Sequence, residues 1–387
     1  MRVLVLAPHP FLQLRGTPID VDIFLRVLSG RPGMTIDLVV YGEGEHVSYP
    51  HVTVYRTPVN ALTRSVKPGF SLRKLASDFH MLRIARELAL RHSYDVVHAG
   101  EEAVFIARHL QRRYGIPYVY DLDSSIAQQM VEQHPWMRPL AGMLNSLEAR
   151  AICGALATAP VCNALADLCR ERGARHVVTL HDISQLSDPY RPPSGRLQRE
   201  VGTDRLILLY VGNLAGYQGV DLLLEAFALA SRRTDTVDLV VIGGVDHDVR
   251  PYRSRAAALG LEGRAHFLGP RPFDELDRYL ADADILTAPR TKGINTPMKV
   301  FPYLHSGRAV LVTDLPMHNQ ILTPDVCMLA APRPEPFADA IVRLAGDAEL
   351  RERLGRAGRA FVEAEHTFEA HARRVNALYD HVARVIN

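Results

Sequence analysis

The sequence has few cysteines, no long apolar run and almost no net charge. Its cysteines form no C-x-x-C pair and no pair of histidines stands at zinc spacing, which argues against a zinc site and favours reduced thiols in a cytoplasmic protein. No stretch of about 20 apolar residues is available to span a membrane, and the short apolar N-terminus is expected to be a first strand rather than a signal peptide. The net charge of +2 argues against a general nucleic-acid-binding protein. The cysteines are Cys153, Cys162, Cys169 and Cys327.

The sequence does contain short β-branched segments that alternate with helix-length segments. A chain of 387 residues is longer than one ordinary domain, and residues 188–200 are rich in proline, glycine and charge, which is typical of a linker. We therefore predict two parallel-sheet α/β domains, 1–187 and 188–365, and a helix over 366–387 that crosses back to the first domain. The predicted strands are Val3–Ala7, Ile36–Tyr41, Val52–Arg56, Val96–Ala99, Tyr118–Asp121 and Val177–Leu180, then Leu206–Val211, Asp238–Gly243, Ala265–Leu268, Ile285–Ala288 and Ala309–Thr313.

The loop after the first strand contains a glycine next to a predicted helix start. Gly16 lets the backbone approach a ligand closely, and Thr17 is a suitable cap for a helix that starts at Pro18. A glycine loop that enters a helix is a ready anion site. The alternative is an ordinary turn between a strand and a helix.

The second domain has a similar glycine-containing loop between its own first strand and the helix that follows. Gly212, Gly216 and Gly219 divide the loop before a helix predicted from Val220. In an open α/β sheet, phosphates bind outside the carboxyl ends of the strands. The next two strands of this domain also end in glycines, which extends the predicted phosphate site to their loops.

The segment that follows the strand Ile285–Ala288 gives the clearest anion-binding pattern. Arg290 and Lys292 lie on a loop, Thr296 is a good N-cap, Pro297 suits the first helical position and Lys299 falls in the first turn. Free backbone N–H groups, a hydroxyl and a lysine would suit a diphosphate. The alternative is that Lys299 is a solvated surface charge.

The order of these motifs resembles glycosyltransferase family 4. The resemblance is carried by GN…YQG-DLLLEA, VIGG, FLG-RP and PR-KG-NTPMK…YL-SG-AVLVTD, and in the first half by RGTPIDV, YDVVHAGEE and YVYDLDSS. It implies the GT-B fold, in which two Rossmann-like doubly wound domains face each other across a cleft. It also implies retaining transfer of a sugar from a UDP-, GDP- or other nucleotide-sugar donor, held mainly by the second domain, with no metal and no other cofactor. The acceptor is a glycan, a lipid-linked sugar or a small molecule.

The predicted donor-binding residues lie mostly in the second domain. They are Gly16, Thr17, Gly212, Asn213, Gln218, Gly243, Gly244, Leu268, Gly269, Arg271, Arg290, Lys292, Asn295, Thr296, Pro297, Met298 and Lys299.

The sequence departs from the family at positions that matter for the donor. The family usually places an arginine and a lysine in the glycine-rich loop, where this chain has Asn213 and Gln218. It usually carries two glutamates seven residues apart, where this chain has Ile294 and Pro302. Pro302 also falls inside the predicted helix, where proline costs about 3 kcal/mol. We therefore expect Arg290, Lys292 and Lys299 to neutralise the diphosphate, with Arg271 as a further candidate.

A group that orients the acceptor is expected at a strand end of the first domain. The family's usual histidine position is Gly100 here, which leaves neighbouring groups as candidates. Each has an alternative: His98 as a buried structural histidine, the glutamates as a solvated helix start, and the aspartates as helix caps. The candidate catalytic residues are His98, Glu101, Glu102, Asp121 and Asp123.

Residues 71–92 form a basic amphipathic helix in the prediction. Between Arg56 and Arg91 the chain has eight Lys or Arg residues against two acids, and the apolar side of the helix carries Leu72, Leu75, Phe79, Leu82 and Leu88. Such a surface suggests weak, peripheral binding to the inner membrane face. The alternative is a helix whose apolar side faces the core.

Three functions remain open at this point. The first is an active glycosyltransferase. The second is a GT-B enzyme of altered chemistry, such as a coupling enzyme or a sugar-nucleotide epimerase or hydrolase. The third is an inactive GT-B binding subunit. The donor base, the donor sugar, the acceptor and the oligomeric state do not follow from the sequence.

Overall fold

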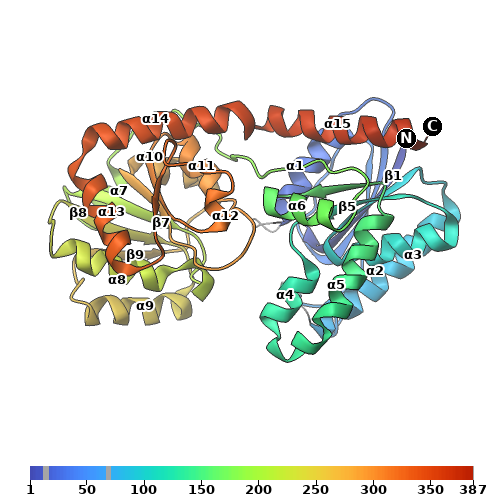
Figure 1. The fold of residues 1–387 in the computed structure, drawn as a ribbon, viewed down its shortest axis with the longest axis horizontal. Coiled ribbons are helices and arrows are strands. Elements are labelled where there is room, and N and C mark those ends of the chain that lie inside the picture. Colours follow the sequence, from blue (N-terminus) through green and yellow to red (C-terminus); the bar gives the residue numbers. More distant parts are fainter. Residues whose placement is uncertain (12–16, 67–70, 387) are drawn as a thin grey trace. The chain divides into compact units, whose positions relative to one another are not determined.

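The computed structural model describes residues 1–11, 17–66 and 71–386, and these form two compact units. The first unit is Met1–His181 with Phe368–Asn387, and the second is Asp182–Thr367. Each unit holds one six-stranded parallel sheet with helices packed around it (Figure 1).

The sheet of the first unit has the strand order β3-β2-β1-β4-β5-β6. The order reverses between β1 and β4, and ligands of open α/β sheets bind at such a switch point. The strands are β1 (Arg2–Phe11), β2 (Thr35–Gly44), β3 (Val52–Arg56), β4 (Val96–Gly100), β5 (Tyr118–Leu122) and β6 (Ala157–Pro160). The helices are α1 (Thr17–Ser29), α2 (Leu72–Arg91), η1 (Glu101–Ala103), α3 (Val104–Tyr114), α4 (Ile126–Gln133), η2 (Pro135–Leu140), α5 (Ala141–Gly154), α6 (Asn163–Glu171) and α15 (Phe368–Ile386).

The sheet of the second unit has the order β12-β11-β10-β7-β8-β9, with its switch point between β7 and β10. The strands are β7 (Leu206–Val211), β8 (Val237–Ile242), β9 (Ala265–Gly269), β10 (Ile285–Ala288), β11 (Ala309–Thr313) and β12 (Met328–Ala330). The helices are α7 (Arg196–Val201), η3 (Gly216–Gln218), α8 (Val220–Ser231), α9 (Asp246–Ala258), η4 (Phe273–Glu275), α10 (Leu276–Asp282), α11 (Val300–His305), α12 (Pro316–Asn319), α13 (Pro334–Gly346) and α14 (Ala348–Glu365).

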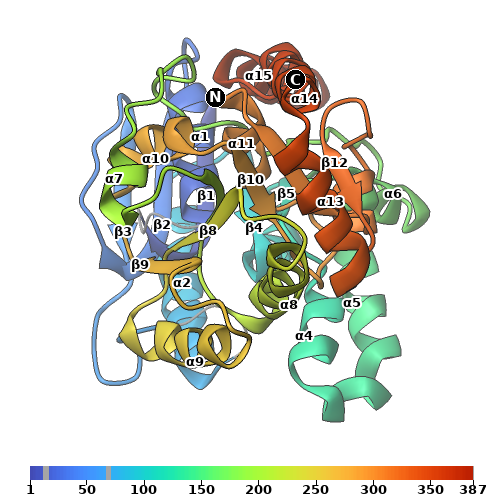
Figure 2. The ribbon, with the colours of Figure 1, turned by 90° about the vertical axis from the view of Figure 1, so that its left-hand side faces the viewer.

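The C-terminal helix α15 is part of the core of the first unit. Val375, Leu378, Tyr379 and Val382 are buried in the same apolar cluster as Phe24 of α1. α15 lies along α1 in both Figure 1 and Figure 2. Ordering one helix against the other is supported by the burial of apolar surface, worth about 25 cal/mol per Å².

The boundary between the units falls slightly earlier than the linker composition suggests. The first unit ends at His181, and residues 188–200 lie in the second unit and run into α7. The two segments at which the chain passes between units bond to each other: His366 Nδ1 is 3.1 Å from the Asp182 carbonyl oxygen, and the Ser184 N–H donates to the His366 carbonyl at 3.0 Å.

The α/β architecture with two doubly wound parallel sheets is confirmed, with one wrong strand and two missed ones. The predicted strand Val177–Leu180 makes only a single bridge, from Val177 to Thr158. β6 lies at Ala157–Pro160 instead, and β12 was not predicted. Both missed strands are short, and β6 reads ATAP, which lacks the β-branched run that identifies the other strands.

Helix α2 forms where residues 71–92 predict a helix, but its apolar residues do not all face the core. Its buried positions include Met81 and Leu88, whereas Leu72, Leu75 and Phe79 are exposed. Three of the five residues that we expected on one apolar side therefore form a stripe on the surface.

Candidate functional site

Two loops meet at the switch point of the second unit, one after β7 and one after β10. Gly219 ends the first loop with a φ of 76°, and a Cβ there would stand 1.8 Å from the carbonyl oxygen of Pro289. The Thr291 N–H donates to the Tyr217 carbonyl at 2.9 Å, which ties the loops together. Only glycine at position 219 permits this close approach.

Lys299 brings an ammonium group to the end of β7. Its Nζ donates to the Tyr210 hydroxyl at 3.1 Å and to Gln218 Oε1 at 3.2 Å, and it lies 4.2 Å from the centre of the Tyr210 ring. A Cβ on Gly212 would stand 2.3 Å from this Nζ. The glycine therefore makes room for the ammonium.

Arg290 supplies a second cation beside Lys299. Its guanidinium lies 5.3 Å from the centre of the Tyr217 ring, Nε donates to the Lys292 carbonyl at 2.8 Å, and a terminal N–H donates to Asn295 Oδ1 at 3.3 Å. Within the part of the chain that the structure describes, neither Arg290 nor Lys299 forms an ion pair with a carboxylate.

The two cations are held in surroundings that disfavour their charge. Burial, together with the nearby charge of Arg290, lowers the pKa of Lys299 to about 7. Burial also lowers the pKa of Arg290. Two desolvated cations without an acid partner would be relieved by a bound anion, which is the arrangement expected of a diphosphate site.

A hydrogen bond from the end of β11 holds the loop that carries Arg290 in place. Thr313 Oγ1 donates to the Arg290 carbonyl at 2.6 Å, and His318 Nδ1 lies 2.9 Å from the Thr313 carbonyl. Burial lowers the pKa of His318 to about 4, so its imidazole is neutral at physiological pH. His318 therefore anchors the loop without adding a third positive charge.

The predicted helix start at Thr296 and Pro297 is wrong. α11 begins at Val300 with Lys299 at its N-cap, because the residues before it form a turn in which the Val300 N–H donates to the Pro297 carbonyl at 3.0 Å. Met298 lies in this turn. The Thr296 side chain is buried, and its Oγ1 accepts from Gln320 Nε2 at 3.1 Å.

The later helix start also removes the expected penalty of Pro302. Pro302 becomes the third residue of α11, within the first turn, where backbone N–H groups have no partner inside the helix. The cost of about 3 kcal/mol for proline inside a helix therefore does not apply.

Glycines of three neighbouring strands pack against one another at the same edge of the sheet. The Gly243 N–H donates to the Gly269 carbonyl at 2.8 Å, and a Cβ on Gly243 would stand 2.0 Å from the Gly212 carbonyl oxygen. In Asn213, the carbonyl accepts from the Tyr210 hydroxyl at 2.6 Å and Oδ1 from the Ala215 N–H at 3.2 Å. Asn213 thus shapes the loop from within.

Other predicted donor residues are placed differently. Arg271 donates to the Leu268 carbonyl at 2.7 Å and forms an ion pair with Glu200, so it already has a carboxylate partner. The Lys292 side chain is exposed, and only its backbone contacts Arg290. Gly244 packs against the side chain of Leu214. Gly16 lies outside the described residues.

The switch point of the first unit gathers acids around one lysine. Lys74 Nζ lies 2.8 Å from Glu102 Oε1 and 3.5 Å from Glu101 Oε2, and Thr17 Oγ1 donates to Glu101 at 3.4 Å. Asp78 accepts from the Tyr41 hydroxyl at 2.5 Å. Burial, reinforced by Glu101, raises the pKa of Glu102 to about 8, and burial raises that of Asp78 to about 6. The cluster therefore retains a proton at neutral pH.

His98 is enclosed between α1 and α15. Its Nε2 lies 3.3 Å from Asp121 Oδ2, its Nδ1 lies 3.2 Å from the Tyr379 hydroxyl, and its ring stacks on Phe24 with 4.2 Å between centroids. Asp123 follows β5 and is half-buried. These contacts favour a structural interpretation of His98, while Asp121, Glu101 and Glu102 keep partly exposed carboxylates.

The cap of α4 is Ser125 rather than either aspartate. Ser125 Oγ accepts from the Gln128 N–H at 3.3 Å and donates to Glu148 at 2.7 Å. Capping therefore does not account for Asp121 and Asp123.

Two features are absent from the part of the chain that the structure describes. No helix within 1–11, 17–66 and 71–386 combines the length and hydropathy that a membrane crossing needs. Over the same residues, no group of three or more His, Cys, Asp or Glu side chains is arranged to hold a metal ion.

The two halves of the chain match two family models. Residues 12–182 match "Glycosyl transferase 4-like domain", and residues 205–347 match "Glycosyl transferases group 1". The chain belongs to the GT-B glycosyltransferase superfamily. Curated glycosyltransferases are also similar to it. Alpha-D-kanosaminyltransferase of Streptomyces kanamyceticus is 24% identical over 77% of this chain and 78% of its own length. D-inositol 3-phosphate glycosyltransferase of Corynebacterium glutamicum is 30% identical over 48% of this chain and 46% of its own length.

Solved structures show the same fold. Sucrose-phosphate synthase from Thermosynechococcus elongatus has a TM-score of 0.79 at 16% identity, with 99% of both chains covered. The Anabaena protein HepE, solved with UDP, has a TM-score of 0.75 at 15% identity, with 98% of this chain and 100% of that chain covered. HepE was also solved with UDP-glucose. These similarities establish the GT-B fold of the two units.

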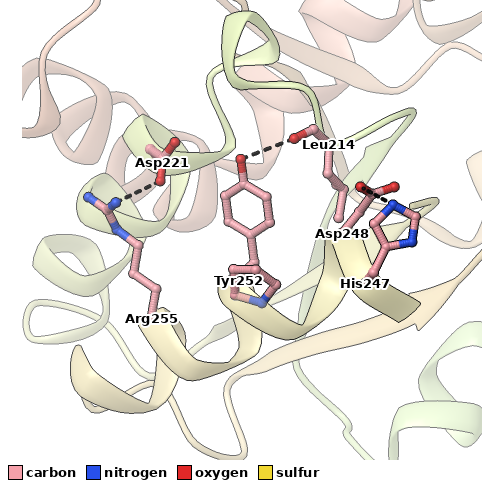
Figure 3. A pocket seen from close by; sticks show the side chains of 7 residues that line it. Leu214, Asp221, His247, Asp248, Tyr252 and Arg255 are labelled. Atoms are coloured by element: carbon pink, nitrogen blue, oxygen red, sulfur yellow. Dashed lines mark hydrogen bonds and ion pairs between the residues drawn. The ribbon is translucent and has the colours of Figure 1, made fainter. Parts of the chain in front are cut away.

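The second unit of this glycosyltransferase also has a pocket that the sequence did not predict. It measures about 600 Å³ and lies between α9 and the start of α8. Figure 3 shows Tyr252 pointing to the Leu214 carbonyl, its hydroxyl 3.1 Å away, and Arg255 paired with Asp221 at 2.7 Å. Its charged side chains already have partners, so it lacks the unpaired cations of the Lys299 site. The other lining residues are His247, Asp248 and Pro251.

Tyr210 and Tyr217, the two tyrosines that contact the cations, are not among the residues predicted from the sequence. Tyr210 lies inside β7, where the sequence does not distinguish it from other core residues. Tyr217 lies in η3, within the YQG motif from which Gln218 but not Tyr217 was predicted to bind the donor. The signal for Tyr210 is a tyrosine near the end of a buried strand, two residues before a glycine.

The Tyr379 side chain is expected to stabilise the first unit of this glycosyltransferase. Tyr379→Ala should lower the free energy of unfolding by about 3–5 kcal/mol, because it empties a buried site between α1 and α15. Tyr379→Phe should cost only about 1 kcal/mol for the lost contact with His98. Urea unfolding measures both, with exposed Phe368→Ala as the control on the same helix. A loss for Tyr379→Ala no larger than that of the control would show that α15 is not docked in this core.

Proposed function

We propose that this glycosyltransferase is a retaining, metal-independent enzyme of family 4 that takes its sugar from a nucleotide-sugar donor. The observation that carries the proposal is the pair of cations without an acid partner, Arg290 and Lys299, at the switch point of the second unit. The nucleotide complexes of HepE support a donor of this class. The proposal assigns the donor to the second unit and the acceptor to the first.

The proposed reaction breaks the bond between the anomeric carbon and the diphosphate oxygen. The acceptor hydroxyl forms the new bond to the same face of that carbon, and its proton passes to an oxygen of the leaving diphosphate. Charge grows on the diphosphate as this bond breaks. Lys299 and Arg290 would stabilise that charge, and such electrostatic stabilisation is usually the largest contribution to catalysis. No carboxylate base and no metal is required by this scheme.

The acidic cluster at the switch point of the first unit is the proposed contact for the acceptor. Glu101 accepts from the Thr17 hydroxyl, Glu102 lies beside the Lys74 ammonium, and Asp121 is near the end of the adjacent strand. Such groups suit hydroxyl-bearing acceptors, which glycans, lipid-linked sugars and small molecules all provide.

The test is a panel of nucleotide sugars on the full chain. UDP-, GDP- and ADP-glucose are titrated while the melting temperature is followed, because a ligand that binds only the native state stabilises it by mass action. Release of nucleoside diphosphate is then measured with mixed acceptors. Binding with transfer supports the proposal. Binding without transfer to any acceptor would favour altered chemistry, and no binding at all would favour an inactive subunit.

We also propose that the protein is cytoplasmic and that α2 attaches it weakly to an anionic membrane surface. The support is the exposed stripe of Leu72, Leu75 and Phe79 on a helix rich in basic residues. In an interfacial helix the apolar side chains enter the lipid and the basic side chains attract anionic headgroups, and α2 exposes both kinds of residue.

Vesicle co-sedimentation tests this attachment. The wild-type chain should sediment with anionic vesicles at low salt and less at high salt. Phe79→Ser should reduce the bound fraction about tenfold, given roughly 1.5–3 kcal/mol for a buried aromatic side chain. Val385→Ser on α15 is the control, since Val385 is exposed on another helix. Equal sedimentation of wild type and Phe79→Ser would refute the attachment.

A further inference from the structure

Lys299 and Gln218 form a hydrogen-bonded pair between the two loops of the second unit's switch point. Gln218 Oε1 accepts from Lys299 Nζ at 3.2 Å, although the two residues belong to different loops. The Gln218 side chain is 7% exposed, so its amide is held in place rather than free in solvent. Its backbone N–H donates to the Ala215 carbonyl at 2.8 Å, which fixes the short η3 turn that presents it.

The hydrogen bonds of the ammonium leave one proton available. A lysine ammonium has three donors. One is used by the Tyr210 hydroxyl and one by Gln218 Oε1, and the Tyr210 hydroxyl itself donates a hydrogen bond to the Asn213 carbonyl. The third proton of Lys299 is then free for a ligand oxygen, and its direction is set by the other two.

The Lys299 ammonium lies against the glycine-rich loop after β7, although Lys299 itself comes from the loop before α11. Nζ lies in the space that a Cβ of Gly212 would fill, and within hydrogen-bonding distance of the residue that ends η3. A lysine side chain at position 218 would therefore reach the place where the Gln218 amide now contacts the Lys299 ammonium.

We propose that Lys299 and Gln218 are an exchangeable pair that provides one diphosphate-binding cation, with Gln218 as the positioning residue for the Lys299 ammonium. The inference rests on the proposed function, because it assumes that the anion is the donor diphosphate. It assigns a purpose to Gln218 and accounts for a glycine-rich loop with no cation of its own. The site requires one ammonium and one amide at positions 218 and 299, and the two groups can be exchanged between these positions.

A charge swap tests the pair. Three proteins are compared by calorimetric titration, at pH 6.5, with whichever of UDP-, GDP- and ADP-glucose the wild type binds best. Lys299→Gln should weaken binding about 10- to 100-fold, as expected for loss of a charged hydrogen bond. The double variant Lys299→Gln with Gln218→Lys should return to within about threefold of wild type, because it restores the same pair with its members exchanged.

The outcomes separate the two proposals. A swap variant that binds no better than Lys299→Gln overturns the exchangeable pair and leaves the donor site in place. Unchanged affinity in Lys299→Gln removes Lys299 from the donor site. Absence of binding by the wild type to all three sugars contradicts the proposed function itself.

A second variant keeps the test decisive if the swap protein does not fold, which thermal melting shows. Gln218→Glu has nearly the same shape as the wild type but adds a carboxylate that pairs with Lys299. It should weaken donor binding about tenfold while the lysine is still present, because the new ion pair cancels the charge offered to the diphosphate. Wild-type affinity in Gln218→Glu would overturn the positioning role of Gln218.

Discussion

Lys299→Ala is expected to weaken binding of the donor by about 10- to 100-fold, the loss that follows from removing a charged hydrogen-bond donor from a diphosphate. The reason is the geometry of the site. The ammonium is held against Gly212 by Tyr210 and Gln218, and it has no carboxylate partner among the described residues. Among the described residues, removing it leaves Arg290 as the remaining cation of the pair.

The control for this prediction is the other lysine of the same loop. The Lys292 side chain is exposed, so Lys292→Ala should change donor affinity by less than about threefold, as is usual for surface charges. Calorimetric titration with the nucleotide sugar gives both values. An equal loss in the two variants would mean that the loop attracts the donor only through its general charge.

Donor affinity is expected to fall as the pH rises above 7. The pKa of free Lys299 is lowered to about 7 by burial and by Arg290. A bound diphosphate favours the protonated form and therefore raises this pKa. Below pH 7 the lysine is already charged and Kd should be constant. Above pH 7 a proton must be taken up on binding, and Kd should rise up to about tenfold per pH unit until the pKa of the complex is reached.

This pH dependence can be assigned to one residue. UDP-glucose is a suitable ligand, because its diphosphate does not titrate in this range. Titration at pH 8 in buffers of different ionisation enthalpy should show uptake of close to one proton per donor bound. The same experiment on Lys299→Ala should show none. His318 does not contribute, since its pKa is about 4. A constant Kd from pH 6 to pH 9 in the wild type would contradict the account of Lys299.

The strands that position the site could be read from the sequence because they are buried on both faces. β7 reads LILLYV and β8 reads VDLVVI, which are the near-continuous apolar runs of a parallel sheet. β6 could not be read in this way because ATAP carries no such run. The start of α11 was misread because Thr296 and Pro297 form a good local capping signal. Contacts from outside the helix decide instead: Gln320 binds Thr296.

The loops of the proposed donor site could be predicted, but the side-chain pairings within the second unit and elsewhere could not. The loops of Gly212 and Arg290 were predicted because each follows a predicted strand and leads into a helix, and the structure places them at the switch point of the sheet. The partner of Arg271 is Glu200, which lies 71 residues away in the chain, and His98 meets Tyr379 across 281 residues. No local pattern reports such contacts.

The departures from family 4 acquire a physical interpretation in this structure. Asn213 shapes the loop through its own backbone and side chain, and Gln218 binds Lys299. Pro302 is accommodated because α11 starts late. The loss of charged residues at these positions is therefore compatible with a functional donor site, which weakens the case for an inactive subunit.

A crystal structure of the full chain with UDP-glucose would show where the diphosphate binds. We expect diphosphate oxygens at about 3 Å from Lys299 Nζ, an ordinary hydrogen-bond distance, with the Arg290 guanidinium beside them. We also expect Gln218 to contact the ammonium in the complex. A diphosphate bound elsewhere in the second unit, for example at Arg271 or in the pocket beside Tyr252, with Lys299 left as it is, would contradict this expectation.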